Sequence, residues 1–108
     1  MTKPNITFRY FFDLGAGTCL WSADDETRNR FGYAVDIDML PVSAETKEQY
    51  ARLLAWHDRA FNWSDPTGDP VLGQEERARF NDAANRLFLQ LRHELPEQFG
   101  LLDEHDPL

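Results

Sequence analysis

His57, Asp58 and Cys19 are the residues whose types could support nucleophilic chemistry. Such chemistry needs a thiolate, a base within hydrogen-bonding distance and a group that orients the base. Asp58 follows His57 directly, so on a helix it points about 100° away and cannot easily orient the imidazole. Cys19 has aromatic and apolar neighbours, among which a thiol stays protonated. We therefore interpret the pair as a buried histidine and a structural cysteine, and predict no catalytic residues.

A small ligand-binding or enzymatic domain is the alternative hypothesis. It places a pocket between the N-terminal strands and the central helix, lined by Tyr10, Cys19 and His57. This hypothesis requires a cavity that solvent can enter and on which at least two of these side chains converge.

Acidic and histidine side chains are the potential metal ligands of this sequence. The aspartates that could contribute are Asp13, Asp24, Asp25, Asp36 and Asp38. Asp-x-Asp is a common pattern, and no glycine-containing loop closed by a Glu follows it as in an EF-hand. The three histidines, His57, His93 and His105, share no ligand spacing. The sequence predicts neither a metal site nor a cofactor, and the carboxylates are interpreted as solvated surface.

The charge balance is strongly acidic. The chain carries 19 acidic and 11 basic side chains, a formal net charge of −8. This charge repels phosphate backbones, and no basic stripe occurs, so nucleic-acid binding is disfavoured. A surplus of carboxylates suits solubility and also fast encounter with a basic protein surface.

Length and composition predict one compact domain, residues 1–108, because 42% of the residues are apolar and can fill a core. A single cysteine cannot form an internal disulfide. The N-terminal residues lack the continuous apolar segment of a signal peptide, and no stretch approaches the roughly 18 apolar residues of a membrane span. We expect a cytoplasmic protein that does not contact membranes.

Alternating side chains predict an N-terminal β-hairpin. Residues 6–14, ITFRYFFDL, have the period of a half-buried strand. Gly-Ala-Gly at 15–17 permits the chain to reverse, and residues 18–22 would return as the second strand. The hairpin is expected over residues 6–22 with a short glycine-containing loop.

Two further segments could extend this hairpin into an antiparallel sheet of three or four strands. Residues 33–40, YAVDIDML, alternate again, with Asp36 and Asp38 on the outer face of an edge strand. Residues 99–102 could pair back onto the hairpin as a last strand. The acidic tail at 103–106 is predicted to be frayed.

Three helices are predicted from capping residues and periodicity. Asp24 begins a short helix over 24–31, with acidic residues in its first turn and Gly32 just beyond its end. Ser43 caps a central helix over 44–63, and residues 64–70 are rich in turn formers. Apolar residues at helical spacing predict a third helix over 74–95.

The resulting fold class is α+β, with the two long helices antiparallel and packed on one face of the sheet. The predicted interior consists of Ile6, Phe8, Tyr10, Phe12, Leu54, His57, Phe61, Leu87 and Leu91. Trp21, Trp56 and Trp63 could fill this core or anchor a contact with a partner, because tryptophan serves both purposes.

A further pattern consists of residues spread over nearly the whole chain. It comprises Tyr10-Phe11-Phe12-Asp13, Cys19-Leu20-Trp21-Ser22, Asp25, Thr27-Arg28, Phe31-Gly32, Leu40-Pro41-Val42-Ser43, Leu54, Trp56, Asp58, Trp63, Pro66, Glu75-Glu76, Phe80 and the helix end Leu91–Leu95. This pattern resembles a group of short, largely uncharacterised bacterial proteins, some of which look like immunity partners of polymorphic toxins. The resemblance implies a compact binding domain and carries over no catalytic residue.

The leading hypothesis is a non-catalytic acidic protein-binding domain, an immunity-type inhibitor of a basic toxin. Its predicted contact residues are Asp24, Asp25, Glu26, Asp36, Asp38, Trp21, Trp56 and Trp63. A homodimer that buries Leu89 or a tryptophan is a further alternative.

Overall fold

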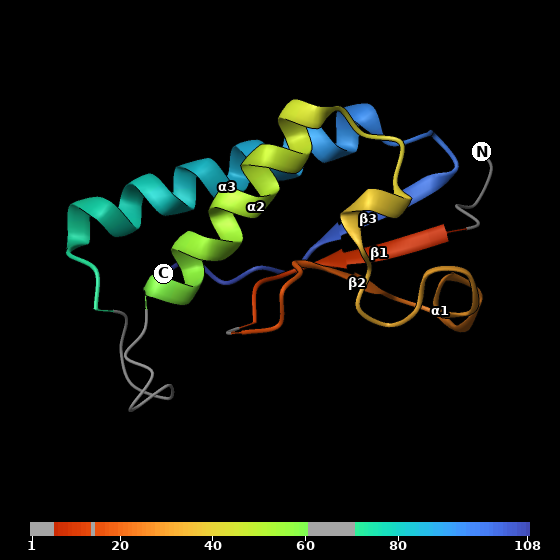
Figure 1. Cartoon of the computed structure of the whole chain (residues 1–108), viewed down its shortest axis with the longest axis horizontal. Helices are drawn as coiled ribbons and strands as arrows, with labels where there is room; N and C mark the ends of the chain where they lie inside the picture. The colour runs from red at the N-terminus through yellow and green to blue at the C-terminus, as the bar shows by residue number, and fades with distance from the viewer. Residues whose placement is uncertain (1–5, 14, 61–70) are drawn as a thin grey trace.

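The structure, a computed structural model, describes residues 6–13, 15–60 and 71–108. Its elements in chain order are β1 (Ile6–Tyr10), β2 (Leu20–Ser22), α1 (Asp25–Phe31), the 3-10 helix η1 (Ile37–Met39), α2 (Ala44–Arg59), α3 (Gln74–Glu94) and β3 (Phe99–Asp103). Figure 1 shows α2 and α3 side by side on one side of the sheet, with α1 on its opposite side. The predicted α+β class is confirmed.

The three strands form a mixed sheet in the order β2-β1-β3. β1 pairs antiparallel with β2, where Phe8 lies opposite Ser22 and Tyr10 opposite Leu20. It pairs parallel with β3, where Ile6 lies opposite Phe99. β1 is therefore the central strand, and its inward side chains Ile6, Phe8 and Tyr10 are completely buried.

The core lies between this strand and the two long helices. Tyr10 reaches α3, where its hydroxyl group donates to the carbonyl oxygen of Ala84 over 2.8 Å. Leu87 and Leu91 of α3 are fully buried, and Phe12 and Leu54 are partly buried against the same core. The predicted interior is confirmed for these residues; Phe61 lies outside the described residues.

The predicted hairpin is confirmed, but its strands are shorter and its connection longer than expected. β1 ends at Tyr10, and β2 begins only at Leu20. Gly15 and Gly17 both have φ of 74°, the left-handed conformation that glycine adopts without a steric penalty. The reversal therefore occurs inside a broader loop, and Asp58 of α2 accepts a hydrogen bond from the backbone N–H of Gly15 over 3.0 Å.

The strand predicted over 33–40 is wrong. The segment makes one isolated bridge, Ala34 to Trp21, and then turns into η1. The Asp36 carboxylate accepts a hydrogen bond from the N–H of Asp38 over 2.9 Å. Such local bonds favour a turn over an extended ladder, which explains why an alternating pattern did not become a strand.

The last strand forms where it was expected, but the predicted antiparallel extension is wrong because β3 runs parallel to β1. α3 ends near the first residue of β1, so the chain enters β3 from the end at which β1 starts. The expectation of a frayed tail is also wrong. Glu104 forms an ion pair of 2.8 Å with Arg9, and the His105 ring packs edge-on against Tyr10.

Caps define the helix boundaries as predicted. Asp24 accepts from the N–H of Thr27 at the start of α1, and Ser43 accepts from the N–H of Thr46 at the start of α2. The helix predicted over 44–63 is α2, Ala44–Arg59; its predicted last residues and the loop at 64–70 lie outside the described residues. None of the described helices has the length and apolar character needed to cross a membrane.

The carboxylate of Glu94 joins the end of α3 to the start of α2. It accepts hydrogen bonds from the N–H of Ser43, over 2.6 Å, and from the Thr46 hydroxyl group. These bonds, led by that from Thr46, lower the pKa of Glu94. A negative charge beside the first turn of α2 is also favoured by the helix dipole. The contact places opposite ends of the two helices together, as an antiparallel pair requires.

Replacing Glu94 should destabilise the fold in a pH-dependent way. Glu94→Ala is expected to lower the free energy of unfolding by about 1 kcal/mol at neutral pH, the usual net contribution of a hydrogen bond. Because the pKa of Glu94 is lower in the folded state, its ionised form stabilises the protein above the unfolded-state pKa, and this benefit disappears as the pH falls through the folded-state pKa.

Urea unfolding at neutral and acidic pH measures the effect. Glu97→Gln is the matched control, because Glu97 is an exposed acid just beyond the same helix. An equal difference between wild type and Glu94→Ala at both pH values would contradict the expectation.

Candidate partner-binding surfaces

The residues of the alternative pocket hypothesis, Tyr10, Cys19 and His57, are all buried. Tyr10 and Cys19 have no exposed surface, and His57 is 8% exposed. Burial raises the pKa of the Tyr10 hydroxyl and that of the Cys19 thiol, so both remain protonated at neutral pH. Burial lowers the pKa of His57, which favours its neutral form. These side chains therefore lack the solvent access that the alternative hypothesis requires.

The surroundings of His57 indicate packing. Its ring stacks on Phe12 with centroids 5.3 Å apart and lies 5.9 Å from Phe80. Asp58, the adjacent carboxylate, instead accepts a hydrogen bond from Gly15 in the hairpin loop. Among the described residues, no group of three or more His, Cys, Asp or Glu side chains is placed to hold a metal ion.

The tryptophans lie in different environments. Trp21 is 7% exposed, stacks on Phe11 and donates from its indole nitrogen to the Phe11 carbonyl oxygen over 3.0 Å, so it belongs to the packed interior. Trp56 is half-buried on α2 and donates to the Glu76 carboxylate over 3.2 Å. Trp63 lies outside the described residues. Of the two described tryptophans, Trp56 is the better placed to contact a partner.

The predicted acidic contact residues are exposed on two segments of the structure. On α1, Asp24 caps the helix, Asp25 pairs with Arg28 at 3.2 Å, and Glu26 is exposed in the first turn. At η1, Asp36 is the N-cap and Asp38 lies within the turn, with its carboxylate 3.5 Å from the Lys47 ammonium group. These acids organise local structure while leaving carboxylates at the surface.

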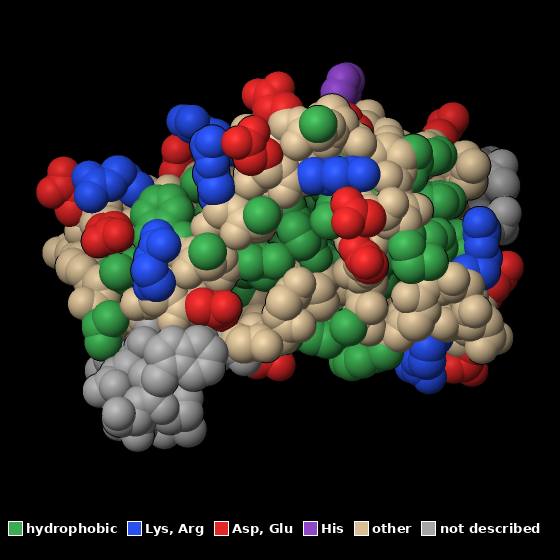
Figure 2. Space-filling view, in the orientation of Figure 1, with side chains coloured by type: hydrophobic (Ala, Val, Ile, Leu, Met, Phe, Trp, Pro, Cys, Tyr) green, Lys and Arg blue, Asp and Glu red, His purple; other side chains and the backbone are tan. Residues whose placement is uncertain are grey.

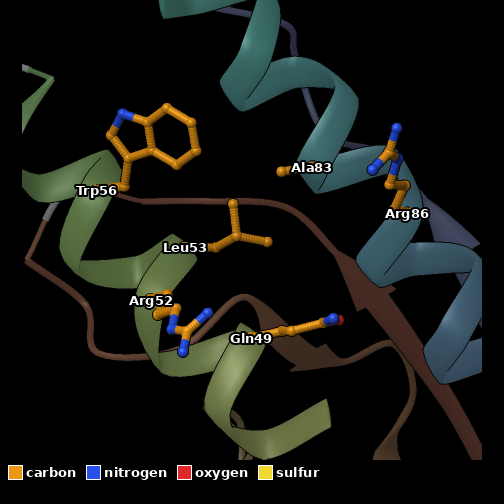
Figure 3. Close-up of a pocket in the computed structure, with 6 residues that line it drawn as sticks. All are labelled: Gln49, Arg52, Leu53, Trp56, Ala83 and Arg86. Atoms are coloured by element: carbon orange, nitrogen blue, oxygen red, sulfur yellow. The ribbon is translucent and has the colours of Figure 1, made fainter. Parts of the chain in front are cut away.

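A groove between α2 and α3 was not anticipated. We call it the α2–α3 groove. Its lining residues are Gln49, Arg52, Leu53, Trp56, Ala83 and Arg86. In Figure 3 the Leu53 and Trp56 side chains extend from α2 toward α3, on which Ala83 lies, while Arg52 and Arg86 border the groove. The cavity measures about 260 Å³. That volume is slightly below the usual range for small-molecule pockets, and suits a single inserted side chain.

The groove has an apolar floor and a charged border. Leu53 is 4% exposed, whereas the bordering arginines are largely exposed. Arg52 pairs with Glu48 at 3.2 Å and Arg86 with Asp82 at 2.9 Å, each within its own helix. Figure 2 shows the same character at larger scale, with hydrophobic side chains visible among interspersed acidic and basic ones. Apolar surface ringed by charges is typical of protein interfaces.

The helical spacing of apolar residues in the sequence cannot show that a space lies between Leu53 and Ala83. The only hint of the groove in the sequence is a difference in side-chain size, because α3 has the small Ala83 where α2 has the large Trp56. A small residue on one helix beside a large one on the other can leave a hollow, but only the helix-to-helix distance decides this.

Tyr50 is a second residue whose role was missed. Its hydroxyl group shares a hydrogen bond with the Thr18 hydroxyl and accepts one from the N–H of Cys19 over 3.3 Å. Burial raises the pKa of Tyr50. Tyr50 therefore fixes the end of the hairpin loop to α2, and its hydroxyl group stays protonated at neutral pH.

The reactivity of the Cys19 thiol tests whether the residues of the alternative pocket are sealed in the core. Cys19 in the native protein is expected to resist Ellman's reagent, because the thiol is fully buried and its raised pKa suppresses the thiolate. The same thiol should react fully after unfolding in guanidinium chloride. Rapid reaction of the native protein, at the rate of a free cysteine, would contradict the buried, inert assignment.

Comparison with known proteins identifies the family. A family model described as Serratia CdiI immunity protein-like matches residues 8–102, a span that contains α1, α2 and α3 together with most of the sheet. No curated protein sequence matches the chain significantly. The match confirms the resemblance to immunity proteins of polymorphic toxins. Because it covers most of the sequence, the chain belongs to the Serratia CdiI immunity protein-like family.

Proposed function

We propose that this protein is a non-catalytic, immunity-type inhibitor that binds a basic toxin domain in the cytoplasm and masks it. The observation that carries the proposal is the family match over residues 8–102. The burial of Tyr10, Cys19 and His57 supports a role in binding over a role in catalysis.

The charge of −8 supports a basic partner. Asp25 and Asp38 are largely exposed, and their ion pairs with Arg28 and Lys47 are also exposed to solvent. Exposed pairs of this kind contribute only about 0–1 kcal/mol, so lysines or arginines of a partner can replace them at little cost. Complementary charge of this kind mainly accelerates association and sharpens specificity.

The α2–α3 groove supplies the apolar part of the proposed contact. Trp56 and Leu53 offer a hydrophobic floor into which a side chain of the toxin would insert. Tryptophans beside well-packed pockets are enriched among residues that dominate binding energy. The acidic segments would thus guide the encounter, and the groove would contribute to the lifetime of the complex.

Growth of cells that express candidate toxins tests the function directly. The candidates are the toxin domains encoded beside the gene for this protein, each produced with and without it. Co-expression is expected to restore growth for one of them, and purified protein should form a stable complex with that domain. Failure to protect against every such domain, with the protein folded and abundant, would overturn the proposal.

Neutralising acids on α1 should slow complex formation. Asp25→Asn combined with Glu26→Gln is expected to lower the association rate several-fold while changing dissociation little, because exposed charges act on the encounter. Asp24 is left intact because it caps α1. Stopped-flow measurements at low and high salt provide the readout, with Glu75→Gln on α3 as the control. An affinity that is independent of salt would count against charge-guided binding.

Filling the groove should weaken the complex. Ala83→Leu is expected to raise the dissociation constant at least about tenfold, or ~1.4 kcal/mol, because the added side chain occupies the space of the inserted one. Ala78→Leu, at an exposed position of the same helix, is the matched control. Calorimetric titration measures binding, and thermal unfolding verifies that both variants fold. Equal affinity of Ala83→Leu and wild type would exclude the groove from the interface.

A further inference from the structure

β3 is an edge strand. In the order β2-β1-β3 it has β1 on one side, and on its other side no strand follows within the part of the chain that the structure describes. An edge strand presents backbone N–H and C=O groups that can pair with another extended segment. The parallel register with β1 shows which of these groups are available.

The register divides the residues of β3 into two sets. The N–H of Glu104 donates to the carbonyl oxygen of Tyr10 over 3.0 Å, so the main-chain groups of residue 104 face β1. Because alternate residues of a strand bond to the same neighbour, Gly100 and Leu102 also face β1. The main-chain groups of Leu101 and Asp103 therefore point away from β1, and within the described residues they have no backbone partner.

A hollow accompanies this edge. It measures about 520 Å³ and lies where the end of α3 and the following turn meet β3. Its lining residues are Arg92, Leu95, Pro96, Glu97, Phe99, Gly100, Leu101 and Leu102. Leu102 is 47% exposed. An added strand would gain main-chain hydrogen bonds from the edge and a place for one side chain in the hollow, the combination found in strand-addition complexes.

Charge around the edge indicates what kind of segment fits. Glu97 lies just before β3 and Asp103 ends it, and both are exposed. Arg92 is the only basic side chain among the residues that line the hollow. β3 itself contains neither lysine nor proline, the residues by which natural edges often discourage pairing. A second copy of this chain would bring its own Glu97 and Asp103 to the same edge, whereas a basic segment would neutralise them.

We propose that the outer edge of β3 binds an extended basic segment of the partner protein as a fourth strand. The identity of that partner as a toxin rests on the function proposed above; the edge, the hollow and their charges do not. The fourth strand pairs with the outward main-chain groups of Leu101 and Asp103, and its lysine or arginine side chains approach Glu97 and Asp103.

Residue-resolved hydrogen exchange of the full chain tests this proposal. Two ligands are used separately: the toxin domain that the protein neutralises, and a short peptide of alternating lysine and valine. The amides of Leu101 and Asp103 are expected to gain protection of at least about tenfold, because each acquires a hydrogen-bond acceptor. The amides of Gly100 and Leu102, already bonded to β1, should change little.

Proline substitution isolates the backbone contribution. Asp103→Pro removes an N–H that points away from β1, so the β1–β3 ladder is retained while the edge loses a donor. It is expected to weaken binding at least about tenfold. Asp103→Asn, which keeps the backbone N–H and a side-chain oxygen toward His105 but loses the charge and the ion pair with that ring, should weaken it less. Ala44→Pro is the control, because the first position of a helix tolerates proline. Thermal unfolding checks that all three variants fold.

Several results would overturn the proposal. One is a neutralising complex in which the Leu101 and Asp103 amides exchange as in the free protein. Another is a concentration-dependent dimer, detected by sedimentation, that protects these same amides; the edge would then pair with a second copy. If no toxin is neutralised, the proposed function fails. Protection of the Leu101 and Asp103 amides by the lysine–valine peptide then still tests strand addition at the β3 edge. Absence of protection by both ligands refutes strand addition.

Discussion

Tyr10 ends the central strand with its ring fully buried and its hydroxyl group bonded to the main chain of α3. The same ring contacts Phe12, Phe88 and His105, which come from the hairpin loop, the long helix and the segment after β3. A buried hydroxyl group without an acceptor would cost ~1–3 kcal/mol, so this bond constrains the distance between sheet and helix. The position of α3, and through it the width of the α2–α3 groove, depends on this contact.

The parts of the fold that follow from local chemistry could be predicted. Asp24 and Ser43 begin helices because their side chains satisfy backbone N–H groups that the helix leaves unpaired. The alternation of Ile6, Phe8 and Tyr10 identified the buried face of β1. Such signals are carried by a few adjacent residues and do not depend on the rest of the chain.

The predictions that failed concern features that depend on competing hydrogen bonds or on the positions of elements remote in sequence. Alternation over residues 33–40 favoured a strand, but the Asp36 side chain offered the backbone a closer partner. The direction of β3 depends on where α3 ends in space, which periodicity does not encode. The groove likewise depends on the separation of two helices around Ala83, and the contact residues of the candidate site were therefore predicted as chemical types without their arrangement.

The reactive groups and the charged groups of this protein are spatially separated. The thiol, the phenol and the imidazole that could have formed a reaction centre are used in packing, as in the stacked pair of His57 and Phe12. Outside them, the carboxylates of Asp25 and Asp38 are held by weak exposed ion pairs. Charged groups at the surface and reactive groups in the core are thus kept apart in a chain that belongs to an immunity protein-like family.

The parallel pairing of β1 with β3 has a consequence for synthesis of the protein. Arg9 and Glu104, which close the far end of this pairing, are 95 positions apart along the chain. A nascent polypeptide emerging from the ribosome therefore exposes one side of its middle strand until residues 99–103 have been translated. Contacts so remote in sequence form slowly, so the sheet closes late in folding.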